Sequence, residues 1–362
     1  MSFLVPTLSR YFFRRYIVTF TTYCLAILFL IFLVDFNESA RRLSRAADYT
    51  ISIGLLISLL RVPTVLQALI PFVALIASIA TLLQLNRKYE LVVTRAAGVS
   101  AWQFLAPLIL ANLLIGTLSI TGLNTLAAYA LQKAENVVVE RNLGSRQSNS
   151  APPWLRQRTA EGDTVVGAQA TSEGGTKLSE ATFFLFDEEQ RIRERLEADS
   201  AVLGDGVWEL TGVKRIRRSE PVELVETATV PTNLKAEFVG ESLTSAETVP
   251  FFELGGKIAT AKSFGLPATS YEMQFHRLLA QPALLAAMTL IAAMVSLKFV
   301  RFGQSLTAIL GGILAGFVLY VVSELIQAFA NAGTIPPVVA AWLPVLVASA
   351  LGTTVLLHKE DG

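Results

Sequence analysis

Long stretches without a formal charge constrain this chain more than any other feature of its sequence. They run over Tyr16–Val34, Val62–Asn86, Ala96–Gln132, Leu278–Leu297, Phe302–Ser323 and Pro336–Leu357, and the shortest has 19 residues. About 20 residues of helix cross a bilayer, and a charged side chain is costly in hydrocarbon. Charged residues are only 16% of the chain, whereas a soluble domain has about 25%. The sequence therefore predicts six transmembrane helices, three on each side of a central segment, and excludes an ordinary soluble protein.

The first apolar stretch could belong to a signal peptide, because Arg10, Arg14 and Arg15 precede it. The apolar core of a signal peptide is usually about 7–15 residues long and ends at a small-residue cleavage site. This stretch is longer, and no convincing site of that kind follows it. We expect a retained membrane anchor.

Basic residues beside the short connections predict the orientation, since they favour the cytoplasmic side. An even number of spans places both termini on one side. That side carries Arg10, Arg14, Arg15, Arg87, Lys88, Arg95, Lys298, Arg301 and Lys359, whereas the other carries Arg41, Arg42, Arg45 and Arg61. We expect cytoplasmic termini and a central segment outside the cytoplasm.

Three arginines of the first loop are an exception to this rule, because they lie on the side that carries fewer basic residues. They are Arg41, Arg42 and Arg45, and they follow Asp35 at the outer end of the first span. They can lie at the interface with their charged ends in water. Alternatively they form a cationic rim that receives an anionic ligand. The sequence leaves both readings open.

The central segment has the pattern of a folded β domain. Short runs with strand character lie between turn residues, over Thr164–Ala168, Ala181–Phe186, Arg191–Ala198, Val207–Ile216 and Val222–Val230. Asp205-Gly206 is typical of a hairpin turn. The expected core comprises Phe183, Phe184, Phe186, Trp208, Leu210, Phe251 and Phe252. We predict an inserted antiparallel, β-jellyroll-like domain over residues 136–268, between spans in residues 1–135 and 269–362.

No catalytic or metal constellation is evident in the sequence. The only histidines, His276 and His358, cannot form a His-Glu-x-x-His pair, and Cys24 is the only cysteine. No phosphate-binding loop occurs, so the chain is not expected to hydrolyse ATP. An acidic central segment argues against nucleic-acid binding. We expect no enzyme activity, no metal and no cofactor.

Two features of the spans bear on function. Ionisable groups in a span are functional candidates, but the two acidic ones, Asp35 and Glu324, lie near the outer ends. An ion-coupled carrier usually needs such groups near the middle, so that class has little support. Gly312 and Gly316 permit close helix contact, either with a partner or within the chain.

The stretch at about residues 86–98 predicts a short amphipathic helix between the second and third spans, on the cytoplasmic side. Its candidate functional residues are Arg87, Tyr89, Glu90, Leu91, Thr94, Arg95 and Gly98. Gly98 is placed to end the helix. A helix that lies on lipid normally carries bulky aromatics and few acids, whereas Glu90 lies within this one. We therefore expect it to dock in a groove of a soluble protein.

At these residues the sequence resembles the LptF/LptG permeases of lipopolysaccharide export. The most specific match runs from Tyr89-Glu90-Leu91-Val92-Val93 to Ala96-Ala97-Gly98. Further matches are Ile70-Pro71-Phe72 in the second span, Arg195-Leu196-Glu197-Ala198 and Gly206-Val207-Trp208-Glu209-Leu210 in the β domain, and Gly316-Phe317-Val318-Leu319-Tyr320 with Ile335-Pro336-Pro337 near the end. The last group is more similar to the LptG branch. One difference is that Phe32 and Leu33 stand where LptG members commonly have a lysine.

The resemblance implies an inner-membrane subunit of an ABC-type exporter in a Gram-negative bacterium. Its partners would be an LptF-like permease, an LptB-like ATPase dimer, and LptC-like and LptA-like periplasmic β proteins. The residues at about 86–98 would couple ATP hydrolysis to transport. Asp35, Arg41, Arg42 and Arg45 would lie on the path of lipopolysaccharide. The alternatives are the LptF paralogue and a membrane-anchored periplasmic scaffold without a transport role.

Overall fold

The computed structural model describes residues 6–43, 50–141, 154–159, 162–172, 176–187, 191–217, 221–232, 245–263, 268–296 and 306–360.

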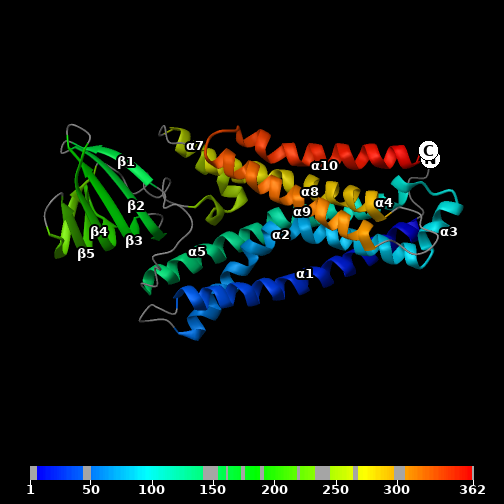
Figure 1. Ribbon diagram of the computed structural model, residues 1–362, viewed down its shortest axis with the longest axis horizontal. Helices are drawn as coiled ribbons and strands as arrows, with labels where there is room; N and C mark the ends of the chain where they lie inside the picture. The colour runs from blue at the N-terminus through cyan, green and yellow to red at the C-terminus, as the bar shows by residue number, and fades with distance from the viewer. Residues whose placement is uncertain are drawn as a thin grey trace.

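Within these ranges, six helices are long and apolar enough to cross a membrane, as predicted. They are α1 (Pro6–Leu43), α2 (Ile51–Arg87), the continuous α4 (Ala101–Leu118), η1 (Ser119–Leu123) and α5 (Asn124–Glu140), then α8 (Thr269–Ser296), α9 (Leu306–Asn331) and α10 (Pro337–Glu360). The third span is thus one long helix that passes through a π-helical turn. Figure 1 shows these helices side by side, with the sheet beyond one end and the short helix α3 (Glu90–Ala96) at the other. We call these the β-domain end and the α3 end.

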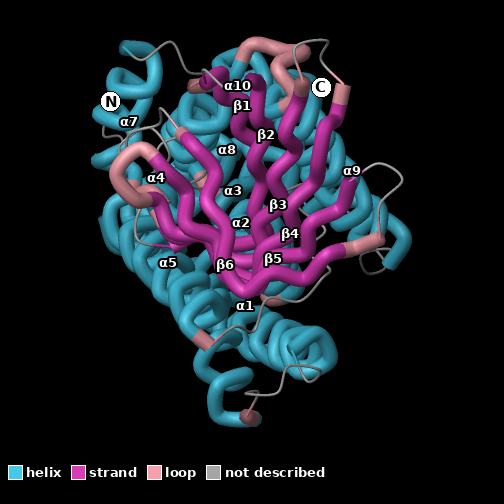
Figure 2. The backbone as a smooth tube through the Cα atoms, turned by 90° about the vertical axis from the view of Figure 1, so that its left-hand side faces the viewer, coloured by secondary structure: helices cyan, strands magenta, loops and turns pink. Residues whose placement is uncertain are grey.

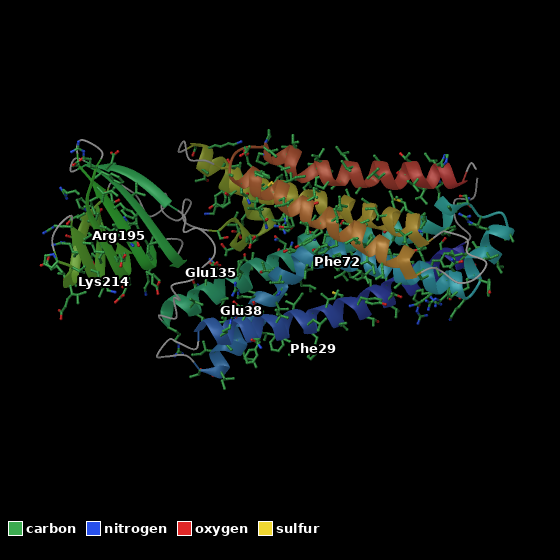
Figure 3. All side chains as sticks on the ribbon, in the orientation of Figure 1. Phe29, Glu38, Phe72, Glu135, Arg195 and Lys214 are labelled. Atoms are coloured by element: carbon green, nitrogen blue, oxygen red, sulfur yellow. The ribbon has the colours of Figure 1, made fainter. Side chains whose placement is uncertain are left out.

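The helices differ strongly in how much of their apolar surface the chain itself buries. α8 is central and packs against α2, α4, α9 and α10. In the apolar windows of the second and fourth spans 61% of the residues are buried, against 11% in the first span and 17% in the fifth. α1 and α9 therefore each expose a row of apolar side chains, as at Phe29 on α1 (Figure 3).

A buried polar chain joins three helices within the bundle. Tyr16 on α1 donates its hydroxyl to Asn112 on α4 at 2.7 Å, and the Asn112 amide donates to Thr289 on α8 at 2.5 Å. An unpaired polar group in such a setting costs about 1–3 kcal/mol. The three side chains therefore specify how these helices pair.

Glycines allow helices to approach closely inside this chain. A Cβ on Gly312 would lie 2.7 Å from Val295 Cγ2 on α8, and one on Gly316 would overlap Leu75 on α2. These two glycines therefore serve packing within the chain, the second of the readings that the sequence left open.

Among the glycines in the described ranges, Gly116 on α4 makes the closest approach to the backbone of another helix, α8. A Cβ on Gly116 would lie only 2.5 Å from the Cα of Pro282, a backbone atom that cannot rotate away. We expect Gly116→Ala to lower the free energy of unfolding by about 1–3 kcal/mol, as overpacking does. Thermal unfolding of the detergent-solubilised protein measures this change. The matched control is Gly122→Ala, where the nearest atom is a flexible leucine methyl at 3.9 Å; equal losses in the two variants would contradict the prediction.

The central segment forms an antiparallel sheet, as predicted. Its described strands are β1 (Trp154–Thr159), β2 (Gly162–Ser172), β3 (Lys177–Phe186), β4 (Ile192–Leu203), β5 (Val207–Arg217) and β6 (Glu223–Pro231), and they are paired in sequential order. Figure 2 shows that the strands bend along their length, so the sheet is curved and not flat. Gly206, with φ of +75°, lies in the predicted turn between β4 and β5. The run Trp154–Thr159 was not predicted as a strand.

The sheet has its own apolar core. Phe183, Trp208 and Leu210 are buried in it, as expected, together with Val166 and Leu196. Phe184 and Phe186 were also expected in this core but are only half-buried, because alternate residues of β3 face opposite sides of the sheet. The rings of Phe183 and Trp208 meet edge to face at 6.0 Å between centroids.

The assignment of Phe251 and Phe252 to this core was wrong. Both lie on α7 (Phe251–Ser263), where Phe251 stacks on Phe275 of α8 at 5.2 Å and Phe252 is exposed. Two adjacent aromatic residues are compatible with a strand or with a helix. Here the helix is stabilised because Phe251 packs against Phe275 of α8.

Candidate functional site

The α3 helix connects α2 and α4 and is shorter than the sequence predicted. Asn86 and Arg87 are the last residues of α2, and α3 begins only at Glu90. The break lies at Tyr89, whose φ of +57° is in the left-handed region. A right-handed helix cannot continue through a residue in that conformation, so α2 and α3 are separate helices. Gly98, with φ of +82°, follows the end of α3.

The two faces of α3 differ in exposure. Leu91 and Thr94 are buried against the bundle, and the Thr94 hydroxyl donates to the Glu90 carbonyl at 2.6 Å. Tyr89 is 71% exposed and Val93 is 67% exposed. These two residues form a small apolar surface that projects beyond the bundle. Val93 was not among the predicted site residues, because its outward direction depends on which face packs.

Glu90 is held by two side chains of α1. Its Oε1 accepts a hydrogen bond from the Tyr11 hydroxyl at 3.3 Å and lies 3.8 Å from Arg15 Nη1. Arg15 also donates to the Tyr11 oxygen at 2.6 Å and to Gln84 Oε1 at 3.3 Å. These contacts join α1 and the end of α2 to the first turn of α3. Glu90 thus connects α3 directly to α1.

Sequence reasoning missed this connection. Arg15 was seen only as a charge flanking the first span, and Tyr11 and Gln84 were not singled out. Tyr11 is 79 positions from Glu90, and no local pattern predicts such a contact. Only the packing of α1 against α2 brings these residues together.

The two predicted arginines of this segment, Arg95 and Arg87, lie in different environments. The Arg95 guanidinium lies over the Phe104 ring, 5.9 Å from its centroid, which fixes its direction by a cation–π contact. Arg87 is exposed in the last turn of α2. At the α3 end, Arg87 thus remains accessible beside the exposed Tyr89.

Asp35 and Arg41, two residues of the predicted cationic rim and its surroundings, lie at the β-domain end of α1. Asp35 accepts a hydrogen bond from Ser39 at 3.3 Å, and Arg41 pairs with Glu38 at 2.9 Å (Glu38 is labelled in Figure 3). Arg42 belongs to α1 by its backbone, and Arg45 lies outside the described residues. The Arg41 side chain is exposed, so its pair with Glu38 is of the weak, water-screened kind. Both readings of these arginines remain predictions.

No group of three His, Cys, Asp or Glu side chains that could hold a metal ion occurs in the described part of the chain. His276 lies on α8 and His358 near the end of α10, at opposite ends of the bundle.

The sequence matches a known family over most of its length. Residues 10–358 match the family described as lipopolysaccharide export system permease LptF/LptG. The chain is 25% identical to the lipopolysaccharide export system permease protein LptG of Escherichia coli K12 over 349 residues, which cover 91% of this chain and 93% of that protein. It is 24% identical to LptG of Haemophilus influenzae over 380 residues, which cover 99% of this chain and all of that protein. These relatives confirm the resemblance to the LptG branch, and the chain belongs to the LptF/LptG family of lipopolysaccharide export permeases.

Proposed function

We propose that this chain is one of two transmembrane subunits of an ABC-type exporter, which takes lipopolysaccharide from the inner membrane and passes it through the β domain towards the outer membrane. The observation that carries the proposal is the family match over residues 10–358, which spans both sets of helices and the sheet between them. The basic residues beside the short connections support cytoplasmic termini. The α3 end would then face the cytoplasm, and the sheet would lie in the periplasm.

An LptB-like ATPase dimer would bind at the α3 end. The exposed Tyr89 and Val93 offer an apolar contact, and Glu90 beside them offers a charge. Because the sequence contains no phosphate-binding loop, the proposal assigns ATP hydrolysis to this separate subunit. A movement of that subunit would act on α3 and, through Glu90 and Arg15, on α1.

A second, LptF-like permease would pair with the outward faces of α1 and α9. These are the spans that the chain itself buries least. α1 exposes Leu25, Phe29 and Leu33, and α9 exposes Leu314 and Phe317. Asp35 and the arginines that follow it would lie at the outer end of the same face, where they could contact the phosphates of the lipid headgroup.

The periplasmic partners would bind the sheet at an edge. β1 and β6 are the outermost strands of the described sheet. β6 carries Leu224, which is 75% exposed. An unpaired edge strand can accept a strand from another protein, which fits LptC-like and LptA-like β proteins as partners.

The proposal is tested by gentle purification of the tagged chain from its native membrane, followed by mass spectrometry of the proteins that copurify. We expect a soluble ATPase and a second permease with six spans. A well-folded preparation that contains neither would overturn the exporter assignment. It would favour a membrane-anchored scaffold.

A further inference from the structure

The second and third spans are each interrupted, and the two interruptions lie beside each other. The third span contains the π-helical turn η1 (Ser119–Leu123), and α2 contains Pro63. π-helical turns and prolines are the usual places where a long helix bends. The Thr64 hydroxyl donates to the Ala127 carbonyl at 3.4 Å, which joins α2 just after its proline to α5 just after the π turn. We call η1 and Pro63 together the joint.

The π turn takes up one residue more than a turn of α-helix would. Asn112 before η1 and Asn124 after it are both buried, whereas Leu114 and Leu126 are both exposed. The members of each pair are 12 positions apart, which in an unbroken α-helix places them about 120° apart around the axis. With one residue taken up by the wider turn, this angle falls to about 20°. η1 thus keeps one face of the span towards the bundle, and one of its residues is extra to the α-helical repeat.

Hydrogen bonding at the joint differs from that of a regular helix. Pro63 has no backbone N–H, so one helical hydrogen bond of α2 is missing. Thr117, Thr121 and Thr125 each donate a side-chain hydroxyl to the carbonyl four residues earlier, at 2.8, 3.0 and 3.0 Å. Such bonds are associated with bent helices, and they can satisfy carbonyls that a bend releases. In the described structure, the buried Ser119 hydroxyl in η1 makes no hydrogen bond.

On the α3 side of the joint, the third span is fixed to the bundle. Asn112 belongs to the buried polar chain between Tyr16 and Thr289, and Gly116 lies against the backbone of Pro282. A closely packed interior resists displacement, so α4 is expected to move only together with α1 and α8.

On the other side of the joint, the outer part of α2 packs against α5. Ile57 of α2 is buried in a small apolar cluster of its own, together with Ile53, Val137 and Val138. Figure 1 shows these two segments side by side, on the side of the molecule away from α10. β1 is the next described element of the chain after α5. We call residues 51–62 and α5 the outer unit.

We propose that the outer unit tilts about the joint as one body and that this tilt transmits movement of the bundle to the β domain. α3 belongs to the bundle side, because Leu91 is part of the main apolar core. This inference rests on the proposed function, in which an ATPase acts on α3. Bending at a few residues between two packed bodies is a common form of switching motion.

The first test measures the flexibility of the joint as the width of the distance distribution between two spin labels. The full-length chain with Cys24→Ser, together with the subunits that copurify with it, is reconstituted in lipid nanodiscs without nucleotide. The outer pair is Gln132→Cys on α5 with Val338→Cys on α10, and the inner pair is Leu110→Cys on α4 with Leu351→Cys on α10. All four positions are exposed. We expect a broad distribution for the outer pair and a narrow one for the inner pair.

Two variants each remove one half of the joint. Deletion of Thr121 takes the extra residue out of η1 and leaves both faces of the span in place, so the chain should remain folded. Pro63→Ala restores the missing hydrogen bond of α2. Each variant should narrow the distribution of the outer pair.

Each of these variants has a matched control. Pro71→Ala also removes a proline from α2, but at a buried position on the bundle side of the joint, and it should leave the width of the outer pair unchanged. Deletion of Leu113 removes an exposed residue from regular helix and moves Gly116 out of its contact with α8. That deletion should lower the temperature of thermal unfolding, whereas deletion of Thr121 should not.

The second test uses the reconstituted complex with ATP and vanadate. We expect the trapped nucleotide to shift the distance of the outer pair in the wild type and to leave it unchanged in the Thr121 deletion. Lipid-stimulated ATP hydrolysis of that variant should fall by about fivefold or more, since coupling between two sites typically corresponds to about 5–150-fold.

Equal widths for the outer pair in the wild type and in both joint variants would overturn the proposal. Unchanged lipid-stimulated hydrolysis in both folded variants would do so as well. A Thr121 deletion that unfolds as the Leu113 deletion does would show that η1 contains no extra residue, which contradicts the basis of the joint. The exporter assignment fails separately, if no ATPase copurifies, and the widths measured without nucleotide test the joint in either case.

Discussion

Replacement of Glu90 by alanine is expected to lower lipid-stimulated ATP hydrolysis of the reconstituted complex by tenfold or more. The carboxylate lies in the first turn of α3, beside the exposed Tyr89, and is held by Tyr11 and Arg15. Its loss removes two contacts between α3 and α1 and, in the proposed complex, a charge on the surface that the ATPase would bind. The few hot-spot residues of an interface each contribute about 2 kcal/mol or more, which corresponds to at least tenfold in affinity, and Glu90 is expected to be one of them. Hydrolysis is measured in proteoliposomes, with and without lipopolysaccharide.

The chain offers a matched control for this variant. Glu253 on α7 also accepts a hydrogen bond from a tyrosine, Tyr129, at 3.2 Å, but it lies at the β-domain end. Glu253→Ala should leave hydrolysis nearly unchanged. Both variants should reach the membrane in normal amounts. Normal stimulation in Glu90→Ala would remove the coupling role from α3.

A double-mutant cycle separates the two roles of Glu90. If the carboxylate acts through Arg15, the losses in Arg15→Ala and Glu90→Ala will not add in the double variant. If it acts directly on the ATPase, the two losses will be independent.

Replacement of Trp208 by alanine is expected to destabilise the β domain by about 3–5 kcal/mol, the usual cost of truncating a buried aromatic side chain. Trp208 is fully buried in the core of the sheet and contacts the ring of Phe183. Hydrogen exchange on the intact protein in detergent reports the free energy of opening of β4 and β5. Exchange in α2 and α8 should remain slow, because the apolar core of the sheet is separate from that of the bundle.

The control for Trp208 lies on the neighbouring strand. Val202 on β4 pairs with Glu209 and is 42% exposed. Val202→Ala should change the free energy of opening by about 0.5 kcal/mol or less, as surface substitutions usually do. Equal effects of the two substitutions would show that Trp208 is not central to this core.

The sequence predicted the elements of the fold because their signals are local. A charge is excluded from hydrocarbon wherever it occurs along a span, so the uncharged stretches located all six helices. Strand alternation and the Asp205-Gly206 turn are equally local, and β2 to β6 were found through them. Phe251 and Phe252 were misplaced because two adjacent aromatics fit either kind of element until α8 supplies a surface.

The existence of α3 and its end before Gly98 also followed from local features, whereas its start at Glu90, after the left-handed Tyr89, was not predicted. The sequence did not show which spans lie inside the bundle. α1 and α8 are both apolar, yet only 11% of the apolar window of the first span is buried, against 61% in the fourth. An apolar helix face is stable against lipid, another helix or another subunit, so hydropathy cannot distinguish these surroundings.

Tertiary structure alone decided the polar contacts between distant residues. Tyr11 donates to Glu90, and Tyr16 to Asn112, only because the helices pack in this arrangement. A hydrogen bond requires atoms within about 3 Å of each other, and a residue's position along the chain does not determine that distance. The sequence by itself therefore determined the six spans, strands β2 to β6 and the resemblance to the family, whereas the contacts around α3 came from helix packing, because they join residues far apart in the chain.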